Sequence, residues 1–446
     1  MTIEAGASRV DITPRTAVPL AGYQRVKVLP GGPKDHVGYV GRTGLSTGVH
    51  DPLFARALVL QDGLGALVAL VALDVCIVTS ELTERVRAEA LSRWDIDPQS
   101  ILIFASHTHG GPDYCGYWES FDDALERDVE MGALAAIESA FASKRPAAFG
   151  WSRGELSTPI VNRRHADRPT DPTVTVLKVE DDSGTCLAVG FSYACHPIVV
   201  GPQDSEVTAD YPGQTAAMIE RELAPECVAL FLPGAGGNIN PVAFPYEDRE
   251  DISKRAKRLM LDGREVSFRS HAEAKRLGLA LGGEVLRVAM MMETQPCVRL
   301  GTWRQVVDVS LKESTELETF LIHDAISDRF AERLRGRRAL QTEVQACRLG
   351  DLVLVGLPGE PFVEIGIALQ EIPADSGATV RALGYTNDYP GYVMRADDYR
   401  ENRYETLATP LDVDGAGAII KAAYSVRDMA LSGSFKAPAV HPETRE

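Results

Sequence analysis

Two histidines one residue apart follow an apolar run in the first quarter of the chain. The stretch from Ile101 to Gly116 reads ILIFASHTHGGPDYCG, so His107 and His109 come where a strand-like run ends and glycines impose a turn. Imidazole is both a common metal ligand and a common general acid or base. An H-x-H pair alone is also frequent as a structural or incidental feature. We interpret it here as one ligand, held rigidly by the strand, and one proton carrier.

Further reactive side chains follow other predicted strands. His196 comes after CLAVGFSYA, Glu360 after DLVLVGLPG, and a glycine loop, PGAGGNINP, after CVALFL. In α/β sheets, ligands bind beyond the carboxyl ends of the strands. Two imidazoles and a carboxylate at separate strand ends indicate a zinc site with a position left open for water. Glu360 as a simple helix cap and Cys115 as a nucleophile are the alternatives.

Strands and helices alternate along the chain, which predicts the elements that position these residues. The pattern is typical of an α/β fold with mixed β-sheets and flanking helices. The absence of a sharp linker favours a single domain over residues 1–446. The expected strands are 66–78, 101–106, 173–180, 186–194, 227–232 and 378–385, with a hairpin at 343–358, and the expected helices are 80–94, 122–143, 210–223, 272–292 and 312–335.

Composition excludes several classes of partner. The 446 residues carry a formal net charge of −17, which argues against nucleic acid and anionic membrane surfaces. No apolar run is long enough to span a bilayer, and the first residues lack a secretory signal, so we expect a cytoplasmic protein. The seven cysteines are scattered singly, which favours reduced thiols. The charged helix at 312–335 faces solvent or mediates a homo-oligomer.

Several other features of the sequence allow two interpretations each. The glycine-rich segment 25–52 is either a lid over a pocket or a plain surface loop. His165 either contacts the substrate or lies on the surface. Asp210 either orients a ligand histidine or begins a helix. GWSRG matches a nucleophile elbow in letters, but the β-like sequence after it argues against that role for Ser152.

Taken together, these motifs resemble the neutral, non-lysosomal ceramidases and their shorter bacterial relatives. The resemblance runs from GASRVDITP and LAGY near the start, through DPLFARALVL, to DDYRENRYE near the end. It implies a mixed α/β catalytic domain with a zinc ion that hydrolyses the amide bond between a fatty acid and sphingosine.

The resemblance also implies roles for the histidines and the glutamate. The family's HTHSGP falls on the residues that begin at His107, which makes His107 a zinc ligand and His109 a catalytic acid or base. The histidine of HPT falls on His196 and the glutamate of PGE on Glu360, as further ligands.

Two tyrosines and an arginine complete the implied set. The family's tyrosine ligand falls on Tyr392, its catalytic tyrosine on Tyr404 and the arginine of INRS on Arg163. From the residues alone, both tyrosines would be assigned to the core or the surface. Arg163 could bind a carbonyl or carboxylate oxygen.

This chain departs from the family pattern at one position of the glycine loop. The family's GDVSP carries a serine, and Asn240 replaces it here. An amide cannot serve as a hydroxyl nucleophile, whereas a mechanism with a zinc-activated water does not require the serine. Asn240 can still donate a hydrogen bond to an oxyanion.

We therefore expect a Zn²⁺-dependent hydrolase that cleaves a C–N amide bond of a small soluble substrate. The sequence ends at Glu446 without the family's immunoglobulin-like domain, which makes ceramide a less favoured substrate. The ligands are His107, His196, Glu360 and Tyr392, and the catalytic residues are His109, Arg163, Tyr404 and Asn240. The alternatives are a zinc-dependent esterase, lactonase or glycoside hydrolase, and a relative that binds a metabolite without turning it over.

Overall fold

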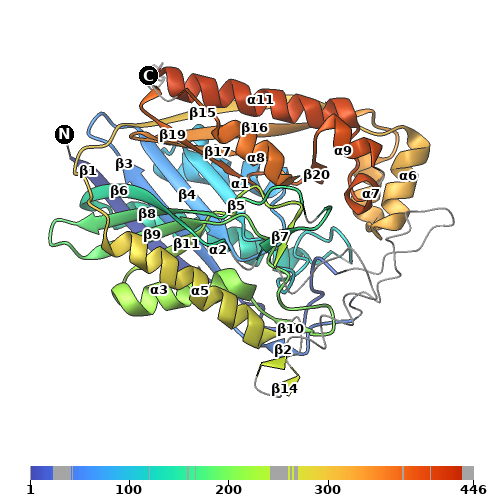
Figure 1. Cartoon of the computed structure of the whole chain (residues 1–446), viewed down its shortest axis with the longest axis horizontal. Helices are drawn as coiled ribbons and strands as arrows, with labels where there is room; N and C mark the ends of the chain where they lie inside the picture. The colour runs from blue at the N-terminus through green and yellow to red at the C-terminus, as the bar shows by residue number, and fades with distance from the viewer. Residues whose placement is uncertain are drawn as a thin grey trace, which may run out of the picture.

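Two mixed β-sheets lie face to face with helices on their outer sides, as Figure 1 shows. This computed structural model describes residues 2–23, 42, 44–119, 121–157, 160–165, 167–241, 260–261, 264–265, 270–373, 376–401 and 403–433. Most of the segment interpreted as a lid, 25–52, lies outside the described residues. None of the helices described here has the length and apolar character needed to cross a bilayer.

The larger sheet has eight strands in the order β11-β9-β8-β6-β1-β3-β4-β5. Its β4–β5 and β9–β11 pairs are parallel and the others antiparallel, which makes the sheet mixed. The strands are β1 (Ile3–Asp11), β3 (Phe54–Gln61), β4 (Leu67–Leu73), β5 (Ile101–Ala105), β6 (Arg145–Glu155), β8 (Thr173–Asp181), β9 (Cys186–Ser192) and β11 (Val228–Phe231).

The smaller sheet has four strands in the order β15-β16-β17-β19. Only its β17–β19 pair is parallel. The predicted hairpin is confirmed, because Leu349 pairs with Leu352 across the turn at Gly350. The strands are β15 (Leu300–Ser310), β16 (Ala339–Leu349), β17 (Leu352–Gly356) and β19 (Thr379–Leu383).

Alternating apolar residues build the layers. In β4, Leu70 faces the smaller sheet and Val71 faces the helices on the outer side. In β17, Leu354 faces the larger sheet and Val355 packs on the side of α11. The main helices are α1 (Ser80–Trp94), α2 (Asp123–Ala142), α3 (Asp210–Leu223), α5 (His271–Met290), α8 (Val363–Gln370) and α11 (Val413–Ser432).

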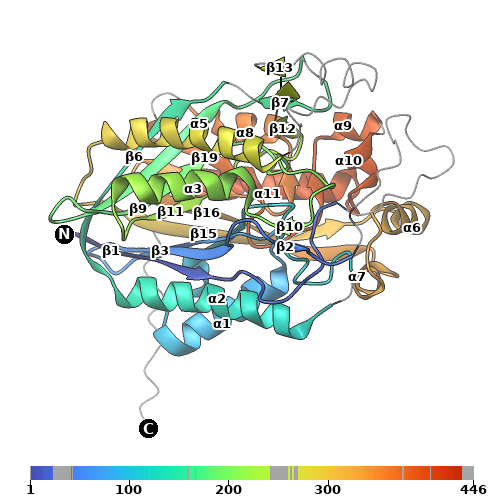
Figure 2. The same cartoon turned by 90° about the horizontal axis from the view of Figure 1, so that it is seen from below.

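Figure 2 shows the same layers from below, with α1 and α2 beside the larger sheet and α3 next to α5. The order of layers is therefore helices, larger sheet, smaller sheet and α11. A mixed α/β architecture with flanking helices, as predicted, is confirmed.

Among the described residues, four short strand pairs lie outside the two main sheets. The pairs are β2 (Gly48–Val49) with β10 (Glu206–Val207), β7 (Ile160–Asn162) with β12 (Ile239–Pro241), β18 (Glu360–Pro361) with β20 (Tyr392–Val393), and β13 (Met260–Leu261) with β14 (Arg264–Glu265). A bridge between Phe104 and Thr386 and another between Gly234 and Leu383 join the two main sheets.

The prediction of a single charged helix over 312–335 is wrong. The chain forms α6 (Ser314–His323) and α7 (Asp328–Leu334) instead, and Ala325 between them has a left-handed backbone with φ of 50°. A left-handed residue cannot continue a right-handed helix. Several other main elements were not anticipated, namely strands β1, β3, β6 and β15 and helix α11.

Candidate metal centre

His107 lies immediately beyond β5, in a backbone conformation that directs the chain out of the sheet. Its φ is 65°, which is uncommon for a residue with a side chain. Backbone hydrogen bonds hold the turn, since Ser106 N donates to Leu73 O at 2.8 Å and His107 N donates to Val75 O at 3.0 Å. The neighbouring strand β4 therefore fixes the position of this imidazole.

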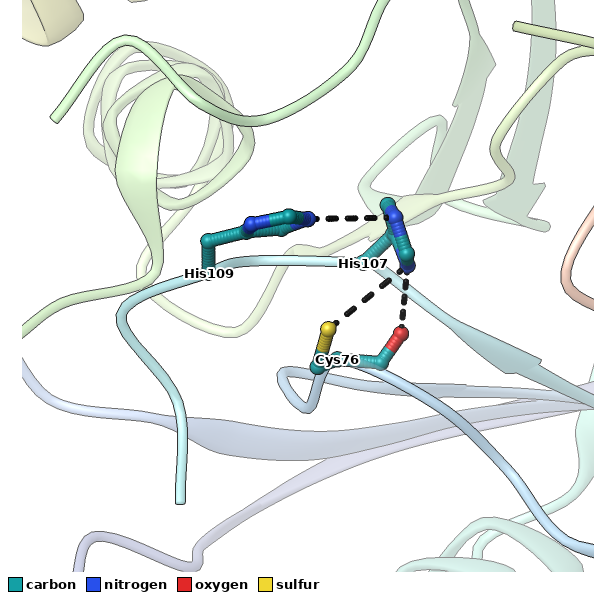
Figure 3. Close-up of side chains that lie close together, drawn as sticks. All are labelled: Cys76, His107 and His109. Atoms are coloured by element: carbon teal, nitrogen blue, oxygen red, sulfur yellow. Dashed lines mark hydrogen bonds between the residues drawn. The ribbon is translucent and has the colours of Figure 1, made fainter. Parts of the chain in front are cut away.

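Backbone carbonyls orient the two buried imidazoles, His107 and His196. Nδ1 of His107 lies 2.7 Å from the carbonyl oxygen of Cys76, as Figure 3 shows, and Nδ1 of His196 lies 2.9 Å from that of Gly236. A carbonyl can only accept, so each Nδ1 carries the proton and each Nε2 presents a lone pair. The two Nε2 atoms are 3.2 Å apart.

Glu360 brings a carboxylate to the same point from the smaller sheet. It begins β18, which follows β17, and its backbone N donates to Gly391 O at 3.0 Å. Its Oε2 lies 3.1 Å from His196 Nε2 and 3.5 Å from His107 Nε2. The donor atoms of these three residues all lie within 4.8 Å of one another. The three side chains thus lie together, as the sequence predicted.

The charges of this triad suit a cation. Burial lowers the pKa of His107 to about 4, so its ring is neutral at pH 7. Burial alone would raise the pKa of Glu360, but His107, His196 and Arg163 hold it at about 2. One carboxylate oxygen and two lone pairs therefore converge on a single point. Ligand atoms bound to zinc at about 2.1 Å lie roughly 3.0–3.4 Å apart. The separations here, 3.1, 3.2 and 3.5 Å, are close to that range.

His109 lies beside this triad. Its Nε2 is 3.2 Å from His107 Nε2, and burial lowers its pKa well below the ordinary histidine value. Its ring packs against the backbone of Gly22, where a Cβ would lie only 2.4 Å from Nδ1. His109 and His107 form a group of donor atoms with Cys76, separate from the group that contains Glu360. This placement suits a proton carrier next to the ligands.

Arg163 and Asn240 are brought together by the β7–β12 pair. Asn240 pairs with Val161, and Arg163 NH1 donates to its Oδ1 at 3.5 Å. Arg163 Nε also donates to the buried Glu405 at 2.7 Å. Among the described residues, Nδ2 of Asn240 has no hydrogen-bond partner although it is buried. This nitrogen is a donor that can serve a bound oxygen.

The two predicted tyrosines meet at Arg163. The guanidinium carbon lies 5.4 Å from the ring centroid of Tyr392 and 5.7 Å from that of Tyr404, and the two rings are 6.0 Å apart. Tyr392 is also the register partner of Glu360 in the β18–β20 pair. Burial raises the pKa of Tyr392 well above 10, and Arg163 opposes this shift. All eight predicted site residues thus gather in one region.

Two residues of this region were missed by the sequence reasoning. Tyr389 donates its hydroxyl proton to Glu360 Oε1 at 2.5 Å. Glu405 holds both Arg163 and Arg164, the latter at 2.8 Å. Tyr389 belongs to the stretch TNDYPGY that follows β19, so its position after a strand was the available signal. Glu405 follows Tyr404 directly and had no signal of its own.

Three alternative roles find no support in the geometry. Asp210 accepts backbone hydrogen bonds from Val200 and Tyr211, whereas carbonyls orient the ligand histidines. His165 lies beside Arg403, 3.1 Å from its guanidinium, and 3.4 Å from Glu401. Burial raises the pKa of the Cys115 thiol well above 9, which disfavours the thiolate that a nucleophile requires.

A half-buried lysine fixes the segment that presents Tyr404. Lys312 Nζ donates to Thr409 O at 2.7 Å and also to Thr406 O, on either side of the end of α10 (Tyr404–Leu407). Burial lowers the pKa of Lys312 to about 8 from 10.5. Between these values the unfolded chain binds more protons, so folding becomes more favourable as pH rises.

We therefore expect the stability of the wild type relative to Lys312→Met to increase with pH. Between about pH 7.5 and 9.5 the gain in unfolding free energy is roughly 1–2 kcal/mol. Urea denaturation of both proteins at the two pH values measures it. A difference that stays constant or falls over this interval would show that Lys312 titrates normally.

The two facing sheets and the cluster of histidines, carboxylate and arginine define an α/β protein with a candidate hydrolytic centre. The family model "Neutral/alkaline non-lysosomal ceramidase, N-terminal" matches residues 33–241. His107, His109, Arg163, His196 and Asn240 lie within that match. The predicted resemblance to the neutral/alkaline ceramidase family is therefore confirmed.

Individual relatives support the same assignment. The neutral ceramidase of Mycobacterium tuberculosis is 26% identical, over 84% of this chain and 71% of its own length. Neutral ceramidase A of Dictyostelium discoideum is 21% identical, over 93% and 72%. The crystal structure of the Pseudomonas aeruginosa neutral ceramidase has a TM-score of 0.72 at 18% identity, covering 97% of this chain and 74% of that one. This last match establishes the shared fold.

Proposed function

We propose that the protein is a zinc-dependent hydrolase that cleaves the C–N amide bond of a small soluble N-acyl amine. One observation carries the proposal. Both Nδ1 protons of His107 and His196 are committed to carbonyls, so their Nε2 atoms and Glu360 Oε2 present three electron pairs to one point. Such an arrangement is repulsive unless a cation occupies the point.

Zinc is the ion that these donors suit best. Neutral imidazole and carboxylate ligands at these spacings are typical of catalytic zinc, which activates water and polarises a carbonyl oxygen when it is bound. Tyr392, the register partner of Glu360, is the proposed fourth ligand. The amide bond as the target is supported by the relatives, which are described as ceramidases.

The remaining side chains divide the work of the reaction. His109, beside the ligands and neutral through burial, takes a proton from the attacking water and delivers it to the leaving amine nitrogen. Arg163 and the Nδ2 of Asn240, which has no partner among the described residues, donate hydrogen bonds to the carbonyl oxygen as negative charge develops there. Tyr404, whose ring lies over Arg163, supports the same oxygen through its hydroxyl.

A panel of matched substrates tests the proposal. The full chain, stripped of metal with a chelator and resupplied with Zn²⁺, is offered a short-chain N-acyl amine, the corresponding ester, a glycoside and a long-chain ceramide in detergent. We expect turnover of the short amide. Adding Zn²⁺ should raise the activity of the stripped protein at least about a hundredfold.

Each other outcome overturns a named part of the proposal. Turnover of ceramide alone would reject the small soluble substrate and keep the amide chemistry. Hydrolysis of the ester or glycoside alone would reject the amide bond. Binding without turnover in the zinc-loaded protein would identify a metabolite-binding relative and reject the enzymatic function.

A further inference from the structure

A second cluster of metal-ligating side chains is linked by hydrogen bonds to the His107–His109 loop. Its members come from three segments that are distant in sequence. The parallel β2–β10 pair, visible in Figures 1 and 2, aligns Gly48 with Glu206 and so brings the residues after β2 near those around β10. His271, the first residue of α5, completes it. The cluster comprises His50, Asp51, Asp204, Glu206 and His271.

The distances from His271 to its carboxylate neighbours are similar to those between the donor atoms of the first centre. Its Nε2 lies 2.9 Å from Asp204 Oδ2 and 3.5 Å from Glu206 Oε2. The donor atoms of these three residues all lie within 4.8 Å of one another. Ligand atoms about 2.1 Å from one ion are separated by roughly 3.0 Å at a right angle and 3.4 Å at a tetrahedral angle. The triad therefore has room for a metal ion of ordinary bond length.

The hydrogen bonding of His271 indicates that an ion pair alone does not account for the cluster. Both ring nitrogens are shielded from solvent, yet neither has a hydrogen-bond partner within the part of the chain that the structure describes. Asp204 is close enough to His271 but is not aligned as an acceptor of its N–H. Buried ring nitrogens usually have partners, so one that does not requires an explanation.

The second histidine extends the cluster on the other side. The ring of His50 stacks on that of His271, with centroids 3.5 Å apart and planes 4° from parallel. Nδ1 of His50 lies 2.8 Å from Asp51 Oδ2, and these two residues form another group of close donor atoms with His271. His271 thus belongs to both groups. Three carboxylates surround two imidazoles here, which favours a cation between them.

We propose that Asp204, Glu206 and His271 bind a second divalent transition-metal ion, with Asp51 and His50 at its edge. One imidazole and two carboxylates suit Zn²⁺ or Mn²⁺ better than the all-oxygen sites that Ca²⁺ and Mg²⁺ prefer. The site stands on its own residues and does not depend on the proposed hydrolase function.

This ion would stabilise the loop that carries the catalytic histidines. Asp51 accepts hydrogen bonds from the Thr208 hydroxyl at 2.6 Å and from Ala209 N at 2.8 Å. The Thr208 carbonyl in turn accepts from the Thr108 hydroxyl at 2.7 Å, and Thr208 N donates to Gly110 O at 3.0 Å. Two steps of hydrogen bonding therefore link the second cluster to the residues on either side of His109. The role is structural, not catalytic.

Metal stoichiometry tests the proposal. The full chain is stripped with a chelator, dialysed against Zn²⁺ or Mn²⁺ and analysed for metal content, together with four variants: His271→Ala, Glu206→Gln, His107→Ala and, as a matched control on the first turn of α5, Glu273→Gln. We expect about two ions per chain in the wild type and in Glu273→Gln, and about one in each of the other three. Metal should still raise the melting temperature of His107→Ala, because that variant keeps the residues of the second site.

The two sites can fail separately. If His271→Ala and Glu206→Gln both bind as much metal as the wild type, the second site does not exist. If the wild type binds one ion that His107→Ala retains and His271→Ala loses, the first centre is wrong and the second stands. Glu206 is partly exposed, so we expect its glutamine variant to fold. That variant still tests the second site if His271→Ala does not fold.

Discussion

Glu360→Gln should abolish hydrolysis while leaving the fold intact. The amide has nearly the same shape as the carboxylate, but it removes the negative charge that faces His107 and His196 at 3.5 and 3.1 Å. We expect the zinc content of the first centre to fall sharply and turnover to drop on the order of a thousandfold or more. Elemental analysis and turnover of the short amide substrate measure the two effects.

Glu371→Gln provides the matched control for this variant. Glu371 is exposed at the end of α8, eleven positions further along the chain, and undergoes the same chemical change. It should keep its metal and its activity. A Glu360→Gln protein that retained both would show that the carboxylate is not a ligand, and the proposed centre would then lack the only negative charge of its triad.

His109→Gln should separate proton transfer from metal binding. General acid–base catalysis contributes about 10²–10⁴-fold, so we expect a loss of kcat in this range with the zinc content unchanged. The separation is informative because His109 Nε2 lies as close to His107 Nε2 as that of His196 does, at 3.2 Å. Steady-state kinetics and metal analysis of the same preparation are the required measurements.

The metal content of His109→Gln decides between two roles for this residue. Loss of zinc together with activity would make His109 a ligand and leave the proton carrier unassigned. Near-normal kcat with normal zinc would remove His109 from the mechanism altogether. Circular dichroism excludes misfolding as the cause of either result.

The convergence of the triad could be predicted because its members follow strands whose ends lie at the same edge. His107, His196 and Glu360 each come directly after an apolar run, and such runs are the clearest sequence signal of buried strands. The positions of Tyr392 and Tyr404 came from the family resemblance alone. In a sequence, an aromatic residue near a site looks the same as one in the core.

Other features could not be predicted because tertiary packing decides them. Helix α11 begins with Val413 and Asp414 followed by two glycines among alanines, a weak helical signal that packing against the smaller sheet overrides. Strand β15 reads LGTWRQVVDVS and is only half-buried, so it lacks the continuous apolar run of β4 or β17. The second cluster escaped notice because His50, Asp204 and His271 share no motif or spacing.

The origin of the three donors has a mechanical consequence for the whole molecule. His107 and His196 extend from the eight-stranded layer, whereas Glu360 extends from the four-stranded one. A cation held among them would connect the two layers much as a cross-link would, in addition to their apolar contacts and the two backbone bridges. Loaded protein should then unfold as one cooperative unit, and the depleted protein should let the smaller layer separate first.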